Sequence, residues 1–270
     1  MGLHSPLQPC LRGKHMSEGS LSLDIPASFT LHAREEVGST NDEVRLLAET
    51  GAQDRTVVWA LRQSAGRGRQ GRTWGSPEGN LYFSLLLRPE VAIAEAANLS
   101  FVAALALADA IKKINPEITP GLKWPNDVLV SSKKVSGVLL ESKSTASGAL
   151  DFLIMGIGVN IRTYPGDARY PATSLLEQGG CDDLSPGDLL SAFLNSFDPW
   201  YKVWKKDGFM AIRSAWLDQA HGIGKTIYVR LPHQTLSGRF VTIDKDGALD
   251  LELDSGEQCL VTAGDVFFAS

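Results

Sequence analysis

The feature that most constrains this chain is an Arg/Gly-rich segment, residues 63–74, that separates two strongly apolar runs. Residues 56–61 and 80–88 each read as a buried strand, so the segment between them is expected to be a loop. Glycine lets a ligand come close to the main chain, and arginine offers a charged, planar fork of donors that suits carboxylates and phosphates. The segment holds Gly66, Arg67, Gly68, Arg69, Gly71, Arg72 and Trp74. It predicts a mobile loop that closes over an anion, with Trp74 offering a flat face to a ring.

Two other interpretations of residues 63–74 remain open, namely a solvated surface loop and an RNA-binding segment. The segment is not a Walker phosphate loop, because the spacing that ends in Gly-Lys-Ser/Thr is absent. Nor is it a dinucleotide fingerprint, since no Gly-x-Gly-x-x-Gly opens a helix here. The net charge of −5 argues against bulk binding of nucleic acid, which usually needs a basic domain.

Size and cysteine usage bound the class of protein. A chain of 270 residues that is 43% hydrophobic can form one large domain, or one large and one small domain. Its three cysteines, Cys10, Cys181 and Cys259, are far apart and lack CxxC spacing, so neither a disulfide framework nor a metal site is expected. The cytoplasm is then the simplest location. No run of eighteen apolar residues occurs, so no membrane association is expected.

The pattern along the chain predicts three parts. Residues 1–28 lack the apolar core of a secretory signal and are expected to be a disordered leader. Residues 29–221 mix strand and helix signals and form the predicted catalytic domain. From residue 222 onward, short alternating strands separated by turns predict a small β-barrel.

Within residues 29–221, the individual elements follow from apolar periodicity and from breakers. Strands are expected at residues 29–37, 56–61, 80–88 and 152–161, and helices at 40–50, 94–114, 186–205 and 208–219. Residues 128–130 and 135–141 are expected to pair as a hairpin whose four-residue loop ends in Lys133 and Lys134.

A second group of polar residues lies at Lys123-Trp-Pro-Asn-Asp127. The proline restricts the residue before it to an extended conformation, so Asn126 and Asp127 are expected to point from the start of a strand. Lys134 follows in the hairpin, where a half-buried ammonium group can neutralise a developing phosphate or carboxylate charge. Because lysines at hairpin tips are usually solvated, these residues alone leave the role of Lys134 open.

Taken in order, the motifs resemble those of biotin protein ligases. The ordered set is Ser39-Thr-Asn41, Gln63-x-x-Gly-Arg-Gly-Arg-x-Gly-Arg-x-Trp74, Lys123-Trp-Pro-Asn-Asp127, Lys134-x-x-Gly137-Val and Gly156-Ile-Gly-Val-Asn160. The resemblance runs from about residue 30 to the C-terminus. It implies an α+β fold, with a mixed-sheet catalytic domain like that of class II aminoacyl-tRNA synthetases and an SH3-like barrel at residues 222–270. It also implies the monofunctional class, without an N-terminal DNA-binding domain and therefore without DNA binding.

The resemblance further implies a two-step reaction. Biotin and Mg·ATP would give biotinyl-5′-AMP and pyrophosphate, and a lysine of the biotin carboxyl carrier domain of acetyl-CoA carboxylase, or of a related carboxylase, would then take the biotin and release AMP. ATP, Mg²⁺ and biotin are thus the expected small molecules. Family members form dimers, so a homodimer is left open.

The roles of individual residues are likewise implied by the resemblance. The residues expected to bind biotin are Ser39, Thr40, Asn41, Gln63, Arg67, Gly68, Arg69, Lys134 and Gly137. Those expected to bind the nucleotide are Arg69, Arg72, Trp74, Lys123, Asn126, Asp127 and Asn160. Arg67, Arg69 and Lys134 are the expected catalytic residues.

Three rival functions are weighed against this interpretation. A lipoate–protein ligase or an octanoyl transferase shares the fold but has a different lysine context and lacks the full Arg/Gly loop. A nucleic-acid-binding module could use the arginines and Trp74 as a stacking platform, against which the acidic net charge argues. A non-catalytic protein that kept the scaffold would not be expected to retain Lys134 and the Arg/Gly loop.

Overall fold

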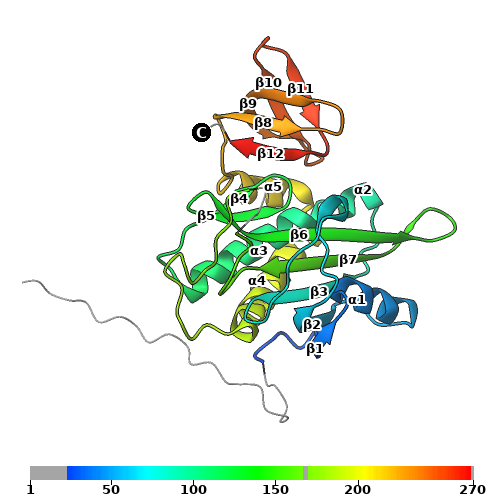
Figure 1. The fold of residues 1–270 in the computed structure, drawn as a ribbon. Coiled ribbons are helices and arrows are strands. Elements are labelled where there is room, and N and C mark those ends of the chain that lie inside the picture. The colour runs from blue at the N-terminus through cyan, green and yellow to red at the C-terminus, as the bar shows by residue number, and fades with distance from the viewer. Residues whose placement is uncertain (1–22, 167–169, 269–270) are drawn as a thin grey trace, which may run out of the picture.

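The structure is a computed structural model that describes residues 23–166 and 170–268. Its larger part is a seven-stranded sheet with strand order β1-β2-β3-β7-β6-β5-β4 (Figure 1). The strands are β1 (Thr30–Val37), β2 (Thr56–Gln63), β3 (Leu81–Leu87), β4 (Pro120–Lys123), β5 (Asp127–Val130), β6 (Lys133–Ser144) and β7 (Leu150–Val159). Only the β1–β2 pair is parallel, so among the described residues the sheet is mixed, as the resemblance implied.

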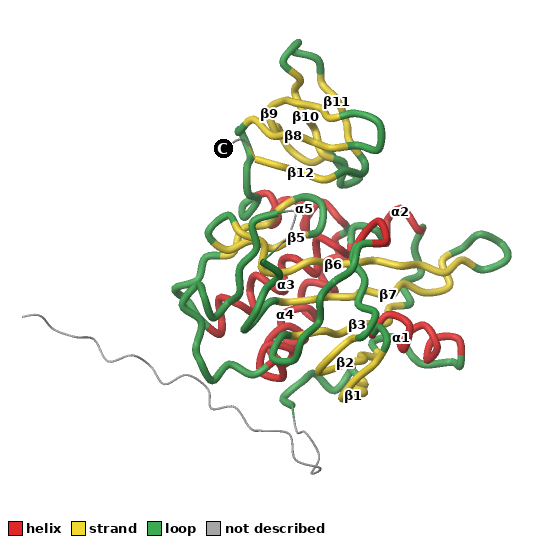
Figure 2. Tube along the Cα trace, viewed as in Figure 1, coloured by secondary structure: helices red, strands yellow, loops and turns green. Residues whose placement is uncertain are grey.

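Helices cover both faces of this sheet (Figure 2). They are α1 (Thr40–Glu49), α2 (Ile93–Ala96), α3 (Leu99–Ile114), α4 (Pro186–Asp207) and α5 (Phe209–Leu217). Successive residues of a strand point to opposite faces. Accordingly Val57 joins the large core that contains α3 and α4, whereas Val58 joins the small cluster that contains Val44 and Ala48 of α1.

The remaining strands form a separate antiparallel sheet with order β11-β10-β9-β8-β12 (Figure 1). They are β8 (Thr226–Arg230), β9 (Thr235–Ile243), β10 (Leu249–Leu253), β11 (Gln258–Val261) and β12 (Asp265–Phe268). The short alternating strands and the turns predicted from the sequence are therefore confirmed in this part of the chain.

Two elements differ from their predictions. The helix expected at residues 94–114 is divided into α2 and α3, because the chain near Asn98 makes tight i→i+3 hydrogen bonds, such as the Phe101 amide to the Asn98 carbonyl. The predicted four-residue hairpin loop is wrong as well. Ser131 and Ser132 have φ of 49° and 62° and alone make a two-residue turn, which leaves Lys133 and Lys134 inside β6.

Three further predictions concern the N-terminal leader, membrane-spanning segments and the cysteines. The leader predicted at residues 1–28 lies largely outside the described residues. Within the described residues, one helical segment, Ile93–Ile114, is long and apolar enough to cross a membrane, but 72% of its most apolar window is buried inside the protein. Cys259 is a free thiol, whereas Cys181 is disulfide-bonded; the sequence analysis, which considered only a disulfide framework, did not anticipate this single bond.

Candidate functional site

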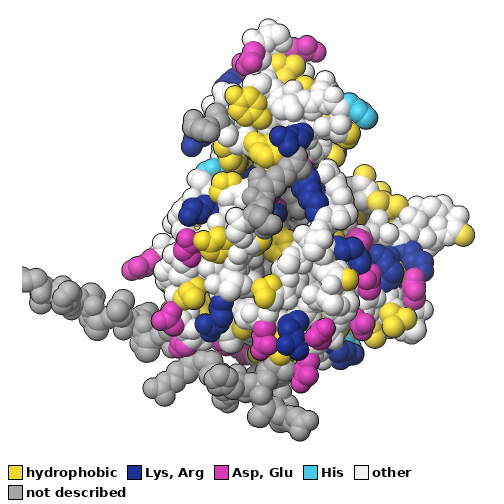
Figure 3. Space-filling model, viewed as in Figure 1, with side chains coloured by type: hydrophobic (Ala, Val, Ile, Leu, Met, Phe, Trp, Pro, Cys, Tyr) yellow, Lys and Arg dark blue, Asp and Glu magenta, His cyan; other side chains and the backbone are white. Residues whose placement is uncertain are grey.

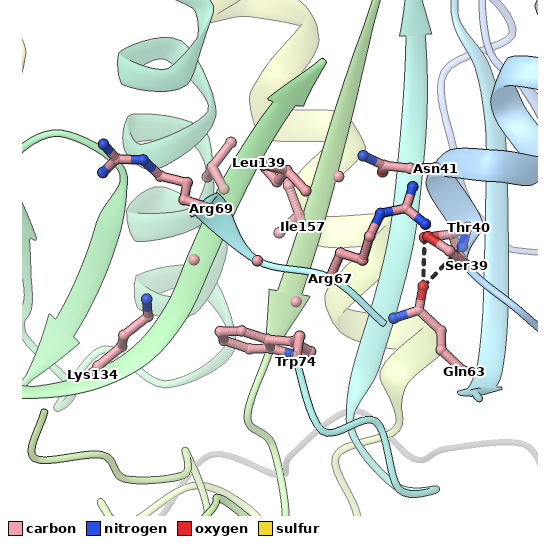
Figure 4. Close-up of a pocket in the computed structure, with 15 residues that line it drawn as sticks. Ser39, Thr40, Asn41, Gln63, Arg67, Arg69, Trp74, Lys134, Leu139 and Ile157 are labelled. Carbon is pink, nitrogen blue, oxygen red and sulfur yellow. Dashed lines mark hydrogen bonds between the residues drawn. The ribbon is translucent and has the colours of Figure 1, made fainter. Parts of the chain in front are cut away.

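A small pocket, with a cavity volume of about 50 Å³, opens on the α1 face of the large sheet, where the N-terminus of α1 meets the Arg/Gly loop (Figure 4). The lining residues are Ser39, Thr40, Asn41, Gln63, Arg67, Gly68, Arg69, Trp74, Lys134, Gly137, Val138, Leu139, Gly156, Ile157 and Gly158. They come from α1, β2, the loop after β2, β6 and β7. Figure 4 shows Lys134 and Arg69 at one side of the pocket, and Ser39, Thr40 and Gln63 at the other.

Alternation along β7 creates the space for the pocket. Ile154 packs in the α1 cluster, and the next two residues on the same face are Gly156 and Gly158. A Cβ at Gly156 would lie 2.3 Å from Asn41 Oδ1, and a Cβ at Gly158 would lie 2.5 Å from the Trp74 ring. The absence of side chains at these two positions is therefore what lets Asn41 and Trp74 lie close to the strand.

A buried chain of hydrogen bonds orders the polar end of the pocket. The Thr40 amide and hydroxyl both donate to Gln63 Oε1, at 2.8 and 3.1 Å, as the dashed lines in Figure 4 show. Ser84 on β3 is fully buried, and its Oγ lies 2.7 Å from Thr40 Oγ1 and 2.5 Å from Asn41 Oδ1. Because Gln63 Nε2 donates in turn to Ser76, the Gln63 amide is satisfied inside the protein and holds Thr40 in place.

Glu141 on β6 joins this polar end to the Arg/Gly loop. Its Oε2 accepts from Asn41 Nδ2 at 2.9 Å and pairs with Arg45 at 3.1 Å, while its Oε1 lies 3.8 Å from Arg67. Arg67 also forms a two-pronged pair with Asp42, at 2.7 and 2.6 Å. The hydrogen bond from Arg67 lowers the pKa of the Asp42 carboxyl, and the same bond raises the pKa of Arg67. Both partners are thus held in their charged forms at the mouth of the pocket.

The other two arginines of the loop reach the C-terminal sheet. Arg69 donates to Asn126 Oδ1 at 3.0 Å and contacts the Gly264 carbonyl at 3.5 Å, and Arg72 pairs with Asp265 at the start of β12. Figure 3 shows Lys and Arg side chains gathered between the two sheets. The sequence predicts a mobile loop, but each of the three arginines of the loop has an acceptor in this structure. The mobility of the loop stays a prediction.

Lys134 lies at the base of the pocket, beside Trp74. Its Nζ is 2.5 Å from Asp127 Oδ1 and 5.4 Å from the centre of the Trp74 ring. Asp127 Oδ2 is also 3.5 Å from the Nζ of Lys123, which is 5% exposed. Burial lowers the pKa of Lys123, and this effect is partly offset by the nearby Asp127 carboxylate.

Ten of the residues named from the sequence line the pocket: Ser39, Thr40, Asn41, Gln63, Arg67, Gly68, Arg69, Trp74, Lys134 and Gly137. The other five, Arg72, Lys123, Asn126, Asp127 and Asn160, do not line it. Asn126 and Asp127 lie just behind the lining. Asn126 accepts a hydrogen bond from Arg69, Asp127 forms an ion pair with Lys134, and the Asn160 side chain donates to the Thr173 carbonyl.

Sequence reasoning missed several contributors to the site. Ser84 and Glu141 carried no local signal, because their partners are more than 40 residues away in the chain. Gly156 and Gly158 did carry one, since glycine weakens a strand interior and often marks the close approach of another group.

Comparison with known proteins identifies the family to which this chain belongs. Residues 35–160 match the Biotin/lipoate A/B protein ligase family, and residues 222–269 match the Biotin protein ligase C terminal domain. The chain is 40% identical to the biotin–[acetyl-CoA-carboxylase] ligase of Paracoccus denitrificans, over 85% of this chain and 97% of that protein. It is 33% identical to the bifunctional ligase/repressor BirA of Bacillus subtilis, over 84% of this chain and 70% of that protein.

Solved structures of biotin protein ligases also resemble this structure. The biotin protein ligase of Aquifex aeolicus in complex with biotin and ATP superposes with a TM-score of 0.76 at 32% identity, covering 88% of this chain and 99% of the other. The Leishmania major biotin protein ligase in complex with biotinyl-5-AMP superposes with a TM-score of 0.61 at 27% identity. It covers 86% of this chain and 98% of the other.

Proposed function

Because the chain belongs to the Biotin/lipoate A/B protein ligase family, we propose that it is a biotin protein ligase. It joins biotin to ATP as biotinyl-5′-AMP and transfers the biotinyl group to a lysine of a biotin carboxyl carrier domain. The carrier belongs to acetyl-CoA carboxylase or to a related carboxylase. The assignments of residues, metal, assembly and location below belong to the proposal.

The observation that favours biotin over lipoate is the polar end of the pocket. Asn41 is ordered there by hydrogen bonds with Ser84 and Glu141, and Thr40 is ordered by hydrogen bonds with Gln63 and Ser84. The bicyclic urea of biotin carries both N–H donors and a carbonyl acceptor that match such a surface. A dithiolane ring or an octanoyl chain carries neither, so it would cover this polar surface without making hydrogen bonds to it.

The first step is attack of the biotin carboxylate on the α-phosphate of ATP, with pyrophosphate as the leaving group. Lys134 Nζ supplies a positive charge to the oxygens whose charge grows as the new bond forms. Arg67 and Arg69, from the loop, close over the carboxylate and the phosphates. Orientation and charge stabilisation account for the rate, without a covalent enzyme intermediate.

The second step is attack of the acceptor lysine's ε-amine on the carbonyl of the mixed anhydride, which breaks the acyl–phosphate bond and releases AMP. The adenylate is reactive toward water, so the loop and Trp74 shield it until the carrier arrives. Trp74 and Arg72 serve the nucleotide, with Lys123, Asn126, Asp127 and Asn160 behind them. Ser39, Gly68 and Gly137 complete the biotin pocket.

Mg²⁺ enters with ATP in this proposal. Within the described residues, no group of three or more His, Cys, Asp or Glu side chains could hold a metal ion. Magnesium at nucleotide sites is commonly held by one or two carboxylates and by the substrate phosphates, so a protein cage is not required.

The remaining assignments complete the proposal. Residues 29–221 form the catalytic domain and residues 222–270 the SH3-like domain. We place the reaction in the cytoplasm and include a homodimer, which sedimentation would test. We include no binding of DNA or of membranes, and a gel shift at several salt concentrations tests the former, because phosphate contacts weaken as salt rises.

Isotopic exchange between ATP and pyrophosphate tests the proposed function. Exchange that requires biotin, and that lipoate or octanoate does not support, is the expected result. Exchange that lipoate supports and biotin does not would replace the proposal with the lipoate ligase alternative.

A further inference from the structure

Asp127 is a carboxylate shared by two lysines. Lys123 ends β4 directly opposite Asp127 in the β4–β5 register, and Lys134 reaches Asp127 from the neighbouring strand β6. Lys134 Nζ lies 2.5 Å from Oδ1, and Lys123 Nζ lies 3.5 Å from Oδ2. Each carboxylate oxygen thus has its own lysine.

The two lysines differ in access to the pocket. The Lys134 side chain is 21% exposed and lines the pocket, whereas the Lys123 side chain is 6% exposed and does not. The Tyr170 ring covers Lys123, with its centre 4.0 Å from Nζ, and stacks on Phe267 of β12. Lys134 is therefore placed to meet a ligand, and Lys123 is held in place behind it.

The charges of Lys123, Lys134 and Asp127 do not cancel. Two ammonium groups and one carboxylate leave a net positive charge that an anion in the pocket can neutralise. When Lys134 turns toward that anion, the Asp127 side chain, which is only 9% exposed, would be left as a nearly buried unpaired charge if it had no second partner. Lys123 provides that second partner.

We propose that Lys123 is a positioning residue that keeps Asp127 paired while Lys134 exchanges its ion pair with Asp127 for one with the ATP phosphates. The inference rests on the proposed function, because it takes ATP as the anion. Without Lys123, Asp127 would have Lys134 as its one remaining lysine partner and would hold it away from the phosphates. Without both Lys123 and Asp127, Lys134 would be released again.

Exchange kinetics of matched variants test this inference. Lys123→Met removes the charge at nearly constant length, and Asp127→Asn removes the opposing charge at constant shape. Since coupling between close charge pairs commonly exceeds a tenfold effect, Lys123→Met is expected to lower kcat/KM for ATP by about tenfold or more in biotin-dependent exchange. The Lys123→Met/Asp127→Asn double variant is used only for the reactivity measurement below, because Asp127 is itself assigned to the nucleotide site.

A purely structural Lys123–Asp127 pair would lower the free energy of unfolding of Lys123→Met, because Asp127 loses a partner, but it would leave the chemical reactivity of Lys134 in the folded protein unchanged. A Lys123→Met variant with wild-type kcat/KM for ATP overturns the inference. Absence of exchange in the wild-type protein instead refutes the proposed function and is recognised before any variant is compared.

Chemical reactivity gives a second measurement that needs no turnover. Acylation of Lys134 by an amine-selective reagent, followed by mass spectrometry, is expected to be slower in Lys123→Met by a factor of about three or more, since its ion pair with Asp127 is strengthened. The rate should rise again in the double variant. Lys206, whose side chain is 84% exposed, is the internal control and should react equally in all three proteins. Equal Lys134 rates in wild type and Lys123→Met would overturn the inference.

Discussion

Replacement of Ser84 by alanine tests whether the buried hydrogen-bond chain controls the biotin pocket. Ser84 is fully buried, and its hydroxyl meets both Thr40 and Asn41. Thr40 keeps its bonds to Gln63, but Asn41 Oδ1 loses the Ser84 donor. A buried acceptor without its donor costs about 1–3 kcal/mol, so the free energy of unfolding is expected to fall by that amount.

The same change is expected to weaken biotin binding, because Thr40 and Asn41 line the pocket. A loss of about 1.4 kcal/mol in their positioning corresponds to a roughly tenfold higher Kd, which calorimetry can measure. Ser196→Ala is the matched control, since Ser196 is 4% exposed on α4 and accepts from Lys113 at 3.0 Å. The control should lose stability but keep its biotin affinity. Unchanged affinity in Ser84→Ala, or an equal loss in the control, would refute the reasoning.

Three further predictions concern the pocket and its surroundings. Gly158→Ala places a Cβ 2.5 Å from the Trp74 ring and should abolish measurable biotin binding by calorimetry, whereas Gly166→Ala, with nothing within 4 Å of its Cβ, should not. Lys134→Ala should slow pre-steady-state adenylate formation by about tenfold or more, the effect of losing one preorganised charge. Burial raises the pKa of Tyr82 from 10.0 to about 12, so stability present below pH 10 should be lost as pH rises to 12. Tyr82→Phe should flatten that loss in urea unfolding.

Much of the fold could be predicted because its signals are local. The run at residues 80–88 is apolar enough to be a buried strand and became β3, and Gly51, with φ of 94°, follows α1 where the helix was expected to stop. The two-residue turn between β5 and β6 was missed because its two serines, Ser131 and Ser132, adopt the left-handed backbone region that is typical of Asn-Gly turns.

The site was predictable to the extent that its residues form ordered motifs. Thr40, Gln63 and Lys134 belong to such motifs, and the fold brings them to one pocket. Glu141 and Ser84 belong to none. Both residues contribute to the site by hydrogen bonding to Asn41 at the start of α1, Glu141 from β6 and Ser84 from β3. No local pattern in a single sequence indicates that these distant strands meet α1.

The most direct test of the account is mass spectrometry of a biotin carboxyl carrier domain incubated with this protein, biotin and Mg·ATP. The account predicts one added biotinyl group, located on the acceptor lysine and absent when ATP is omitted. A carrier that remains unmodified under these conditions, while a known biotin protein ligase modifies it, would contradict the account.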